Sequence, residues 1–491
     1  MGRYSVPAEI RAMKPKGTMV KAISGHYYVY EYRSVREGGR RRTEMGRCIG
    51  RITEAEGFVS NAGTKVADSE VTCVEFGQYA VAMDCSKGTL ALLRGHFARA
   101  DADRIYACAL IHFVEGFQRM GALAKLYGMS VLSLRMPGLK MGYDALAGLY
   151  EDLGRRQGPV LSFEQALVDS CSGEVAVDGH VIGSRSLGNS LAEKGYRLQK
   201  LGEPQVSMLM AYDVRTGMPL LSRMYEGGAA DAVSVRDLFR QAHLAGMLFL
   251  ADRGFLSEEN LALFTSDGNQ YVIPLPKGDR RCRASVALAA GEGSQGRFVW
   301  MRGRKACVVE WRDDMLAGRR VLHFRDLSEQ AEIQANYLRH MEMGTSGYTQ
   351  EGLDAMLPYM GVTVLQTSLG SGRPAQEIWS LYKRRWSIET FFDYFKNGQG
   401  AVALGQQDYC REQGLAFILL VSALIMREVS DAAEASGLGM SVGDILLDAR
   451  MVKACRRFGQ WEAVNCKKKR LELFSKMKTG LEVVPRPEQH T

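Results

Sequence analysis

The sequence predicts an α/β fold. Short, continuously apolar segments at 175–177, 206–212 and 247–251 are typical of strands buried in the middle of a sheet. The segment 235–245, between the second and third of them, has apolar residues at helical spacing. A further strand-like segment at 362–367 lies far along the chain, so we expect the sheet to be interrupted by an insertion.

The composition is that of an ordinary globular protein. The chain has 491 residues, of which 46% are apolar and 24% charged, and this length allows about two to four domains. Its 63 Lys and Arg residues outnumber its 55 Asp and Glu residues. The resulting net charge of +8 is compatible with a polyanionic partner but does not by itself identify one.

The spacing of the cysteines and the lengths of the apolar runs indicate in which compartment the protein is expected. The ten cysteines are scattered without a Cys-x-x-Cys spacing, which disfavours a zinc ribbon or a redox pair and favours buried thiols in a reducing cytoplasm. The longest apolar run, 414–426, has 13 residues, whereas a membrane span needs about 20. We therefore expect a core helix there, no membrane partner, and a cytoplasmic protein.

Two regions precede the α/β domain. Region 1–60 alternates like strands around Gly38-Gly39, which predicts an Arg-rich β-hairpin. Its interleaved tyrosines and arginines suit a nucleic-acid contact and a solvated hairpin about equally. Region 61–170 has apolar residues at helical spacing at 106–126 and 143–153, which predicts helices.

The remaining boundaries follow from changes in pattern. We expect the α/β domain to comprise 171–269 and 361–430, with a β-rich insertion at 270–360 between its two parts. Region 431–491, which contains a cluster of lysines, is predicted to be helical.

Within the insertion the pattern predicts hairpins followed by one helix. A helix is expected at 328–341, with Ser328 as its N-cap. Basic residues are expected at the turns of the hairpins, namely Arg280, Arg281, Arg283, Arg302, Arg304 and Lys305. The strands are predicted at 271–273, 298–301, 307–311 and 321–324.

Four polar residues are spaced three, four and seven apart: Tyr382, Arg385, Glu389 and Lys396. On an α-helix they fall within an arc of about 60°, beside an apolar flank that can pack on a core. A solvated Arg385–Glu389 ion pair is the simplest explanation of the helix alone. A metal ligand next to a phosphate-binding face is the alternative, and it requires acidic partners elsewhere.

Two aspartates can supply such partners. Asp178 and Asp252 each follow an apolar strand segment. A glycine comes one residue after Asp178 and two residues after Asp252, and an aspartate before a glycine is also common in ordinary turns. If both strands are central in one sheet, the two carboxylates emerge at the same edge. Together with Glu389 they could bind two Mg²⁺ ions, which prefer carboxylate oxygens.

With these residues in place, the chain resembles the bacterial insertion-sequence DDE transposases of the insertion-sequence-four superfamily. The resemblance rests on Asp178, Asp252 and the pattern Tyr-x2-Arg-x3-Glu-x6-Lys that ends at Lys396. Supporting similarity runs through 212–219, 226–231 and 251–255 and covers roughly 170–430. It implies a ribonuclease-H-like catalytic domain, with a mixed sheet and flanking helices, split by a β-rich insertion.

The same resemblance implies the chemistry. Asp178, Asp252 and Glu389 would bind two Mg²⁺ ions, for which Mn²⁺ can substitute, and Tyr382, Arg385 and Lys396 would position DNA. The protein would cleave at the ends of an insertion sequence and transfer the 3′-hydroxyl ends to target DNA, in a cut-and-paste reaction. Region 61–170 would bind inverted-repeat ends, and a homodimer would form on double-stranded DNA at the nucleoid.

Two alternatives remain open, and one departure from the family pattern bears on the second of them. His180 stands where this family often has Thr, two positions after the first aspartate. A ribonuclease-H-like nuclease would cut DNA without joining it. A catalytically inactive relative would bind DNA without Mg²⁺-dependent chemistry.

Overall fold

The computed structural model describes residues 6–37, 40–55, 57–60, 73–183, 191, 193–194, 204–226, 235–239, 244–385, 408–457 and 460–484. The chain divides into two compact units, Met1–Val71 and Thr72–Thr491, and each is considered by itself. In the described residues there is no helix with both the length and the apolar character required to cross a bilayer.

The first unit is a small antiparallel sheet. Helix α1 (Ala8–Ala12) precedes four strands, which pair in chain order: β1 (Thr18–Ile23), β2 (His26–Glu37), β3 (Arg40–Thr53) and β4 (Gly57–Ser60). Strands β2 and β3 form the predicted hairpin, with Glu37 opposite Arg40. Ile10, Val29 and Ile52 make its buried core.

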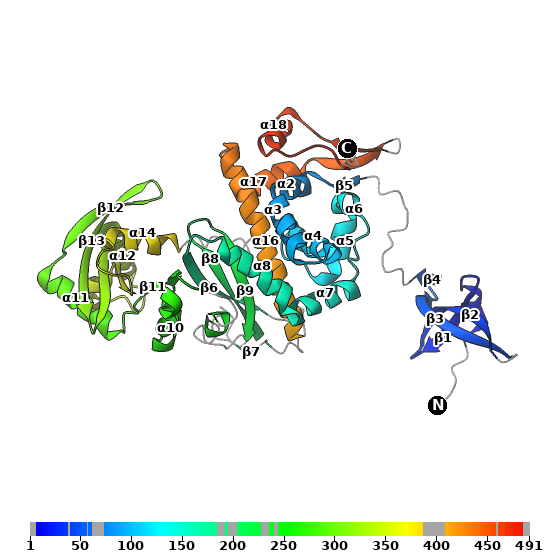
Figure 1. The fold of residues 1–491 in the computed structure, drawn as a ribbon, viewed down its shortest axis with the longest axis horizontal. Coiled ribbons are helices and arrows are strands. Elements are labelled where there is room, and N and C mark those ends of the chain that lie inside the picture. Colours follow the sequence, from blue (N-terminus) through cyan, green and yellow to red (C-terminus); the bar gives the residue numbers. More distant parts are fainter. Residues whose placement is uncertain are drawn as a thin grey trace. The chain divides into compact units, whose positions relative to one another are not determined.

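The second unit begins with a layer of helices around α16 (Tyr409–Ser436) (Figure 1). Every residue of α16 from Glu412 to Ile425 is buried, as the apolar run at 414–426 predicts. The predicted helical stretch at 106–126 is two helices, because the chain leaves α4 at Gly116, whose φ is 83°. The surrounding helices are α2 (Gly77–Cys85), α3 (Lys87–His96), α4 (Arg99–Glu115), α5 (Met120–Gly128), α6 (Leu132–Arg135), α7 (Tyr143–Arg155) and α8 (Gln157–Asp169).

Helices α7 and α16 cross at two glycines. A Cβ on Gly154 would lie 1.9 Å from the Cys410 carbonyl oxygen, and a Cβ on Gly414 would lie 2.1 Å from the Tyr150 carbonyl oxygen. Glycine inside a helix costs up to about 1 kcal/mol relative to alanine, so its presence here reflects the close approach of the two backbones.

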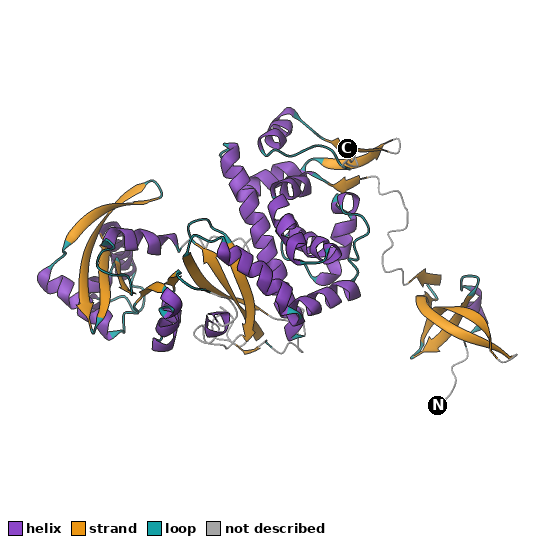
Figure 2. Cartoon of the chain, in the orientation of Figure 1, coloured by secondary structure: helices purple, strands orange, loops and turns teal. Residues whose placement is uncertain are grey.

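The central sheet is mixed, as expected for the predicted fold class (Figure 2). Its order is β12-β13-β14-β15-β11-β10-β6-β8-β7, with β9 also paired to β8. Strand β10 is parallel to both β6 and β11, whereas the other described pairs in this sheet are antiparallel. Strand β11 (Gln270–Pro274), which was expected in the insertion, pairs with β10 (Leu248–Ala251) and so belongs to the central part of the sheet. The other strands that are not between β11 and β15 are β6 (Glu174–Gly183), β7 (Glu193–Lys194), β8 (Pro204–Asp213) and β9 (Pro219–Glu226), and β15 (Val362–Thr367) follows them in the chain.

The segment between β11 and β15 contributes strands to the same sheet. Strand β14 pairs with β15, which itself pairs with β11. Its elements are α11 (Arg280–Glu292), β12 (Gly296–Arg302), β13 (Lys305–Leu316), β14 (Arg319–Asp326), α12 (Leu327–Glu342) and α13 (Gln350–Met356).

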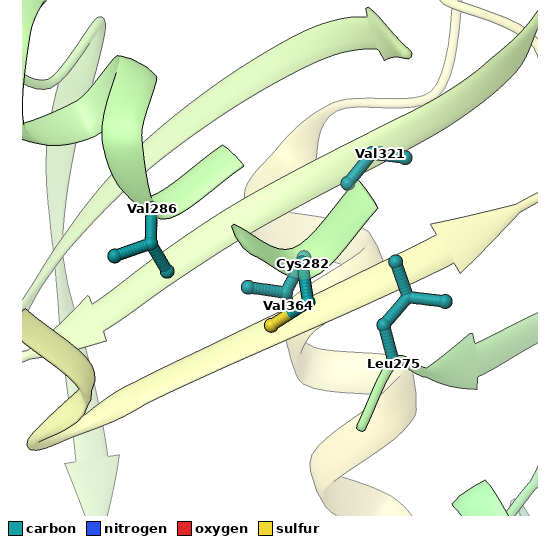
Figure 3. Packing of buried hydrophobic residues seen from close by; sticks show 5 residues of the cluster. All are labelled: Leu275, Cys282, Val286, Val321 and Val364. Carbon is teal, nitrogen blue, oxygen red and sulfur yellow. The ribbon is translucent and has the colours of Figure 1, made fainter. Parts of the chain in front are cut away.

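Two predictions for this segment are wrong. Arg280, Arg281 and Arg283 lie in helix α11 and not at hairpin turns, because Cys282 and Val286 anchor that helix on Val321 of β14 and Val364 of β15 (Figure 3). The N-cap of α12 is Asp326, whose carboxylate accepts hydrogen bonds from the backbone N–H groups of Ser328 and Glu329, and not Ser328 itself.

The C-terminal region is also not purely helical, contrary to prediction. After α17 (Val442–Arg450), strands β16 (Lys453–Arg457) and β17 (Gln460–Val464) form a hairpin, and α18 (Lys468–Lys476) follows. Strand β16 pairs with β5 (Cys73–Glu75) from the start of this unit, which makes a separate three-stranded sheet.

Candidate active site

The two predicted aspartates occupy equivalent positions in neighbouring segments of the sheet, Asp178 within β6 and Asp252 directly after β10. Strand β10 runs parallel to β6 with Ala251 opposite Val177, so the next residues along the two strands are Asp252 and Asp178. Adjacent strands are about 4.8 Å apart, so the two carboxylates share one edge region of the sheet. The backbone of Asp252 is extended, with φ −80° and ψ 162°, and a turn of 3-10 helix starts directly after it.

Only Asp252 follows the end of a strand. Asp178 was predicted to end its strand before a glycine turn, and this is wrong, because β6 continues to Gly183. Strand β8 supplies the pairing partner for this continuation, with Met210 opposite Asp178 and Leu209 opposite Gly179. The backbone N–H of Gly179 donates to Oδ1 of Asp178 at 2.9 Å.

A third carboxylate lies on the same face of β6. Side chains alternate between the faces of a strand, so Glu174 and Asp178, four residues apart, point the same way. Glu174 is only 8% exposed and accepts from Arg215 at 2.9 Å and from Arg384 at 3.2 Å. This bonding to Glu174 raises the pKa of the Arg215 guanidinium. No local pattern in the sequence marks Glu174, because its partners Arg215 and Arg384 lie 41 and 210 positions away along the chain.

Helix α14 (Ala375–Arg384) brings the basic residues to this face. Ile378, Trp379 and Leu381 are buried and fix the helix on the core, with the Trp379 ring 4.9 Å from Phe324. The ammonium group of Lys383 lies 4.3 Å from the centre of the Trp379 ring, and burial lowers its pKa. The apolar face of α14 thus sets where its last turn points.

The end of α14 places the predicted residue Arg385 next to Asp252, and the predicted residue Tyr382 next to Arg385. Nη2 of Arg385 lies 3.7 Å from Oδ1 of Asp252, and the Arg385 side chain is 8% exposed whereas that of Asp252 is 41% exposed. The Arg385 guanidinium lies 5.7 Å from the centre of the Tyr382 ring. Tyr382, Arg385 and Asp252 therefore form one cluster, while Glu389 and Lys396 lie outside the described residues.

The donor set fits a hard divalent cation. Asp178 and Asp252 offer carboxylate oxygens from adjacent positions, and Asp252 is accessible to solvent. Within the described ranges no three His, Cys, Asp or Glu side chains are grouped closely enough to hold a metal. The predicted third ligand, Glu389, lies in the stretch 386–407, which is not described.

Comparisons with known proteins place the chain in a family. The family model described as "Transposase DDE domain" matches residues 169–421. Among solved structures, the cryo-EM structure of a piggyBac transposase synaptic complex with hairpin DNA matches with a TM-score of 0.41 and 10% sequence identity, over 84% of each chain. No curated protein matches. Because this family model matches more than half of the chain, the chain belongs to the DDE-domain transposases.

Proposed function

We propose that this protein binds the ends of an insertion sequence, cleaves phosphodiester bonds there, and transfers the resulting 3′-hydroxyl ends to target DNA. The observation that carries the proposal is the position of two aspartates. Asp178 and Asp252 directly follow the paired residues Val177 and Ala251 of the parallel strands β6 and β10, and Arg385 lies 3.7 Å from Asp252. A structural role alone does not explain why two acidic side chains sit next to each other at an accessible position.

Each residue of the site has a distinct task in this proposal. Asp178 and Asp252, with Glu389, hold two Mg²⁺ ions, or Mn²⁺ in their place. Bound divalent ions lower the pKa of a coordinated water and stabilise charge on phosphate oxygens. Arg385 is held by burial and by the Tyr382 ring, so its guanidinium is in position to orient Asp252 and to contact a DNA phosphate. Lys396 contacts the same DNA strand.

The partner is double-stranded DNA that carries inverted-repeat ends. Region 61–170 binds those ends, and two copies of the chain pair them in a synaptic homodimer at the bacterial nucleoid. The reaction follows the cut-and-paste type, with a 3′-hydroxyl as the nucleophile in the joining step.

The test uses the full chain with duplexes that contain the inverted repeats flanking its reading frame. We expect Mg²⁺-dependent cleavage at the repeat ends, joining of pre-cut ends to a target plasmid, and loss of both activities with EDTA. The variant Asp252→Ala should bind the repeats and neither cut nor join them. Cutting retained by Asp252→Ala would exclude the metal assignment.

The same assay separates the alternatives. Cleavage by the wild-type chain without joining of pre-cut ends would identify a nuclease. Binding to the repeats that never leads to Mg²⁺-dependent cleavage would identify an inactive DNA-binding relative.

A further inference from the structure

The positive charge of the chain is concentrated near its C-terminus. Residues 451–480 contain nine Lys and Arg residues and two Glu residues, a net charge of +7, whereas the whole chain carries +8. The other residues are therefore nearly balanced in charge. Neither the predicted DNA-end binding region nor the active site uses this segment.

Several of these basic side chains are exposed and have no acidic partner in the described part of the chain. We call Arg456, Lys467, Lys468 and Lys478 the C-terminal basic surface; all four are exposed. By contrast, Lys453, Lys469 and Lys476 form ion pairs, with Glu75, Asp448 and Glu472 respectively.

The C-terminal basic surface is held on a folded support. Leu473 and Phe474 of α18 and Met477 directly after it are buried, and the Phe474 ring stacks on Phe76 with centroids 6.4 Å apart. Strand β16, which carries Arg456, pairs with β5. The charges are therefore fixed in place by the second unit, and binding through them costs less ordering entropy than binding through a flexible tail.

Stability of the fold does not account for these charges. The first turn of α18 contains Lys468, Lys469 and Arg470 and no acidic residue. Cations at the start of a helix oppose its dipole, at a cost of about 0.3–1 kcal/mol each at exposed positions. Charge that is unfavourable for the free protein is explained most simply by a polyanion that binds it.

We propose that the C-terminal basic surface binds the phosphate backbone of duplex DNA, without reading its sequence. This inference rests on the proposed function, since it takes DNA as the substrate. Trp461, opposite Arg456 on the hairpin, adds an aromatic side chain next to the basic ones. Lysines contact phosphates as point charges, so we expect an affinity term that depends on salt and not on base sequence.

The test measures the affinity of the full chain for a duplex of about 30 base pairs without the inverted repeats, by fluorescence anisotropy from 50 to 300 mM KCl. The variant combines Lys467→Gln, Lys468→Gln and Lys478→Gln. Three lost phosphate contacts should reduce the slope of log K against log salt by about 2.7 and weaken binding at least about 10-fold at 100 mM KCl. A second variant, Arg456→Gln with Lys478→Gln, removes two contacts, so its slope should fall by about two thirds as much as that of the first variant.

A matched control removes three other exposed cations that have no acidic partner within the described residues: Lys277→Gln, Arg304→Gln and Arg339→Gln. It should keep the wild-type slope, and thermal unfolding should show that all variants are folded. An unchanged slope in the C-terminal variants, or an equal loss in the control, would overturn the inference while leaving wild-type cleavage and joining intact. If the wild-type chain binds no DNA at all, the proposed function fails first.

Discussion

Strand β6 carries two carboxylates on one face, Glu174 and Asp178, with different neighbours. Glu174 is nearly buried and lies between Arg215 and Arg384, at 2.9 and 3.2 Å. Four residues farther, about 13 Å along the strand, Asp178 lies beside Asp252. There Asp252 pairs with Arg385, whose Nη2 atom lies 3.7 Å from its Oδ1 atom.

Two consecutive arginines therefore serve two different purposes. Arg384 completes the neutralisation of a buried carboxylate and ties α14 to the sheet. Arg385 approaches Asp252 without closing a hydrogen bond and leaves the aspartate 41% exposed. Glu174 is thus nearly buried under two charge-assisted hydrogen bonds, whereas Asp252, to which the proposed function assigns metal binding, keeps a solvent-accessible carboxylate.

The largest expected effect is on catalysis. Asp252→Asn keeps the size of the side chain and removes the charge, so cleavage of repeat-end DNA should fall by about 10³-fold or more, because the amide is a poor ligand for a hard cation. Single-turnover cleavage in Mg²⁺ measures this loss, and anisotropy should show DNA binding within about 2-fold of wild type. Glu174→Gln serves as the control, and its cleavage rate should stay within about 10-fold of wild type. A greater loss of cleavage in Glu174→Gln than in Asp252→Asn would contradict the different roles of the two carboxylates.

Stability should respond in the opposite order. Glu174→Gln weakens two charge-assisted hydrogen bonds at a nearly buried position and should lower the free energy of unfolding by about 1–3 kcal/mol. Urea unfolding followed by circular dichroism measures it. The matched control is Glu377→Gln, which breaks an exposed pair with Arg373 and should cost less than about 0.5 kcal/mol. Equal costs would show that the Glu174 cluster contributes no more than a surface ion pair.

The two arginines of α14 allow a finer comparison. Arg385→Lys loses the planar guanidinium next to the Tyr382 ring and should slow cleavage about 10-fold. Arg384→Lys keeps a cation near Glu174 and should change the cleavage rate less than about 2-fold. Single-turnover rates at saturating DNA measure both effects. A larger effect for Arg384→Lys would mean that Arg384, and not Arg385, contacts the DNA.

The smallest effect tests the electrostatic state of the free site. Without divalent ions, Asp178 and Asp252 repel each other, so Asp252→Asn should raise the melting temperature by about 1–2 °C, equivalent to about 0.5 kcal/mol. Differential scanning fluorimetry in EDTA measures this, and adding Mg²⁺ should stabilise the wild type but not the variant. A lower melting temperature for Asp252→Asn would mean that its pair with Arg385 outweighs the repulsion.

The sequence predicts the parts of this protein whose signals are local. Buried strands such as β8 and β10 are continuous apolar runs, and Asp252 follows directly after one of them. The apolar run at 414–426 likewise predicts α16. Helix α11 has a weak helical period in the sequence because it is rich in alanine and its buried apolar residues, Cys282 and Val286, are small.

The parts that the sequence does not predict depend on contacts between distant residues. Glu174 meets Arg384 across 210 positions, and neither residue has a local pattern that selects it. The hairpin of β16 and β17 gains its third strand from β5, at the other end of the unit, so the region was predicted as helical. Asp178 appeared to end a strand because Gly179 follows it, but the pairing with β8 extends that strand.

The crossing of α7 and α16 has a consequence for how relatives of this chain can be recognised. Gly154 and Gly414 admit no side chain, since even a methyl group would collide with a carbonyl of the facing helix. In any lineage that keeps this crossing, neither position can drift to alanine, however far the surfaces diverge. A pair of glycines at these two places is therefore a landmark for aligning distant family members whose overall identity is too low to guide the alignment.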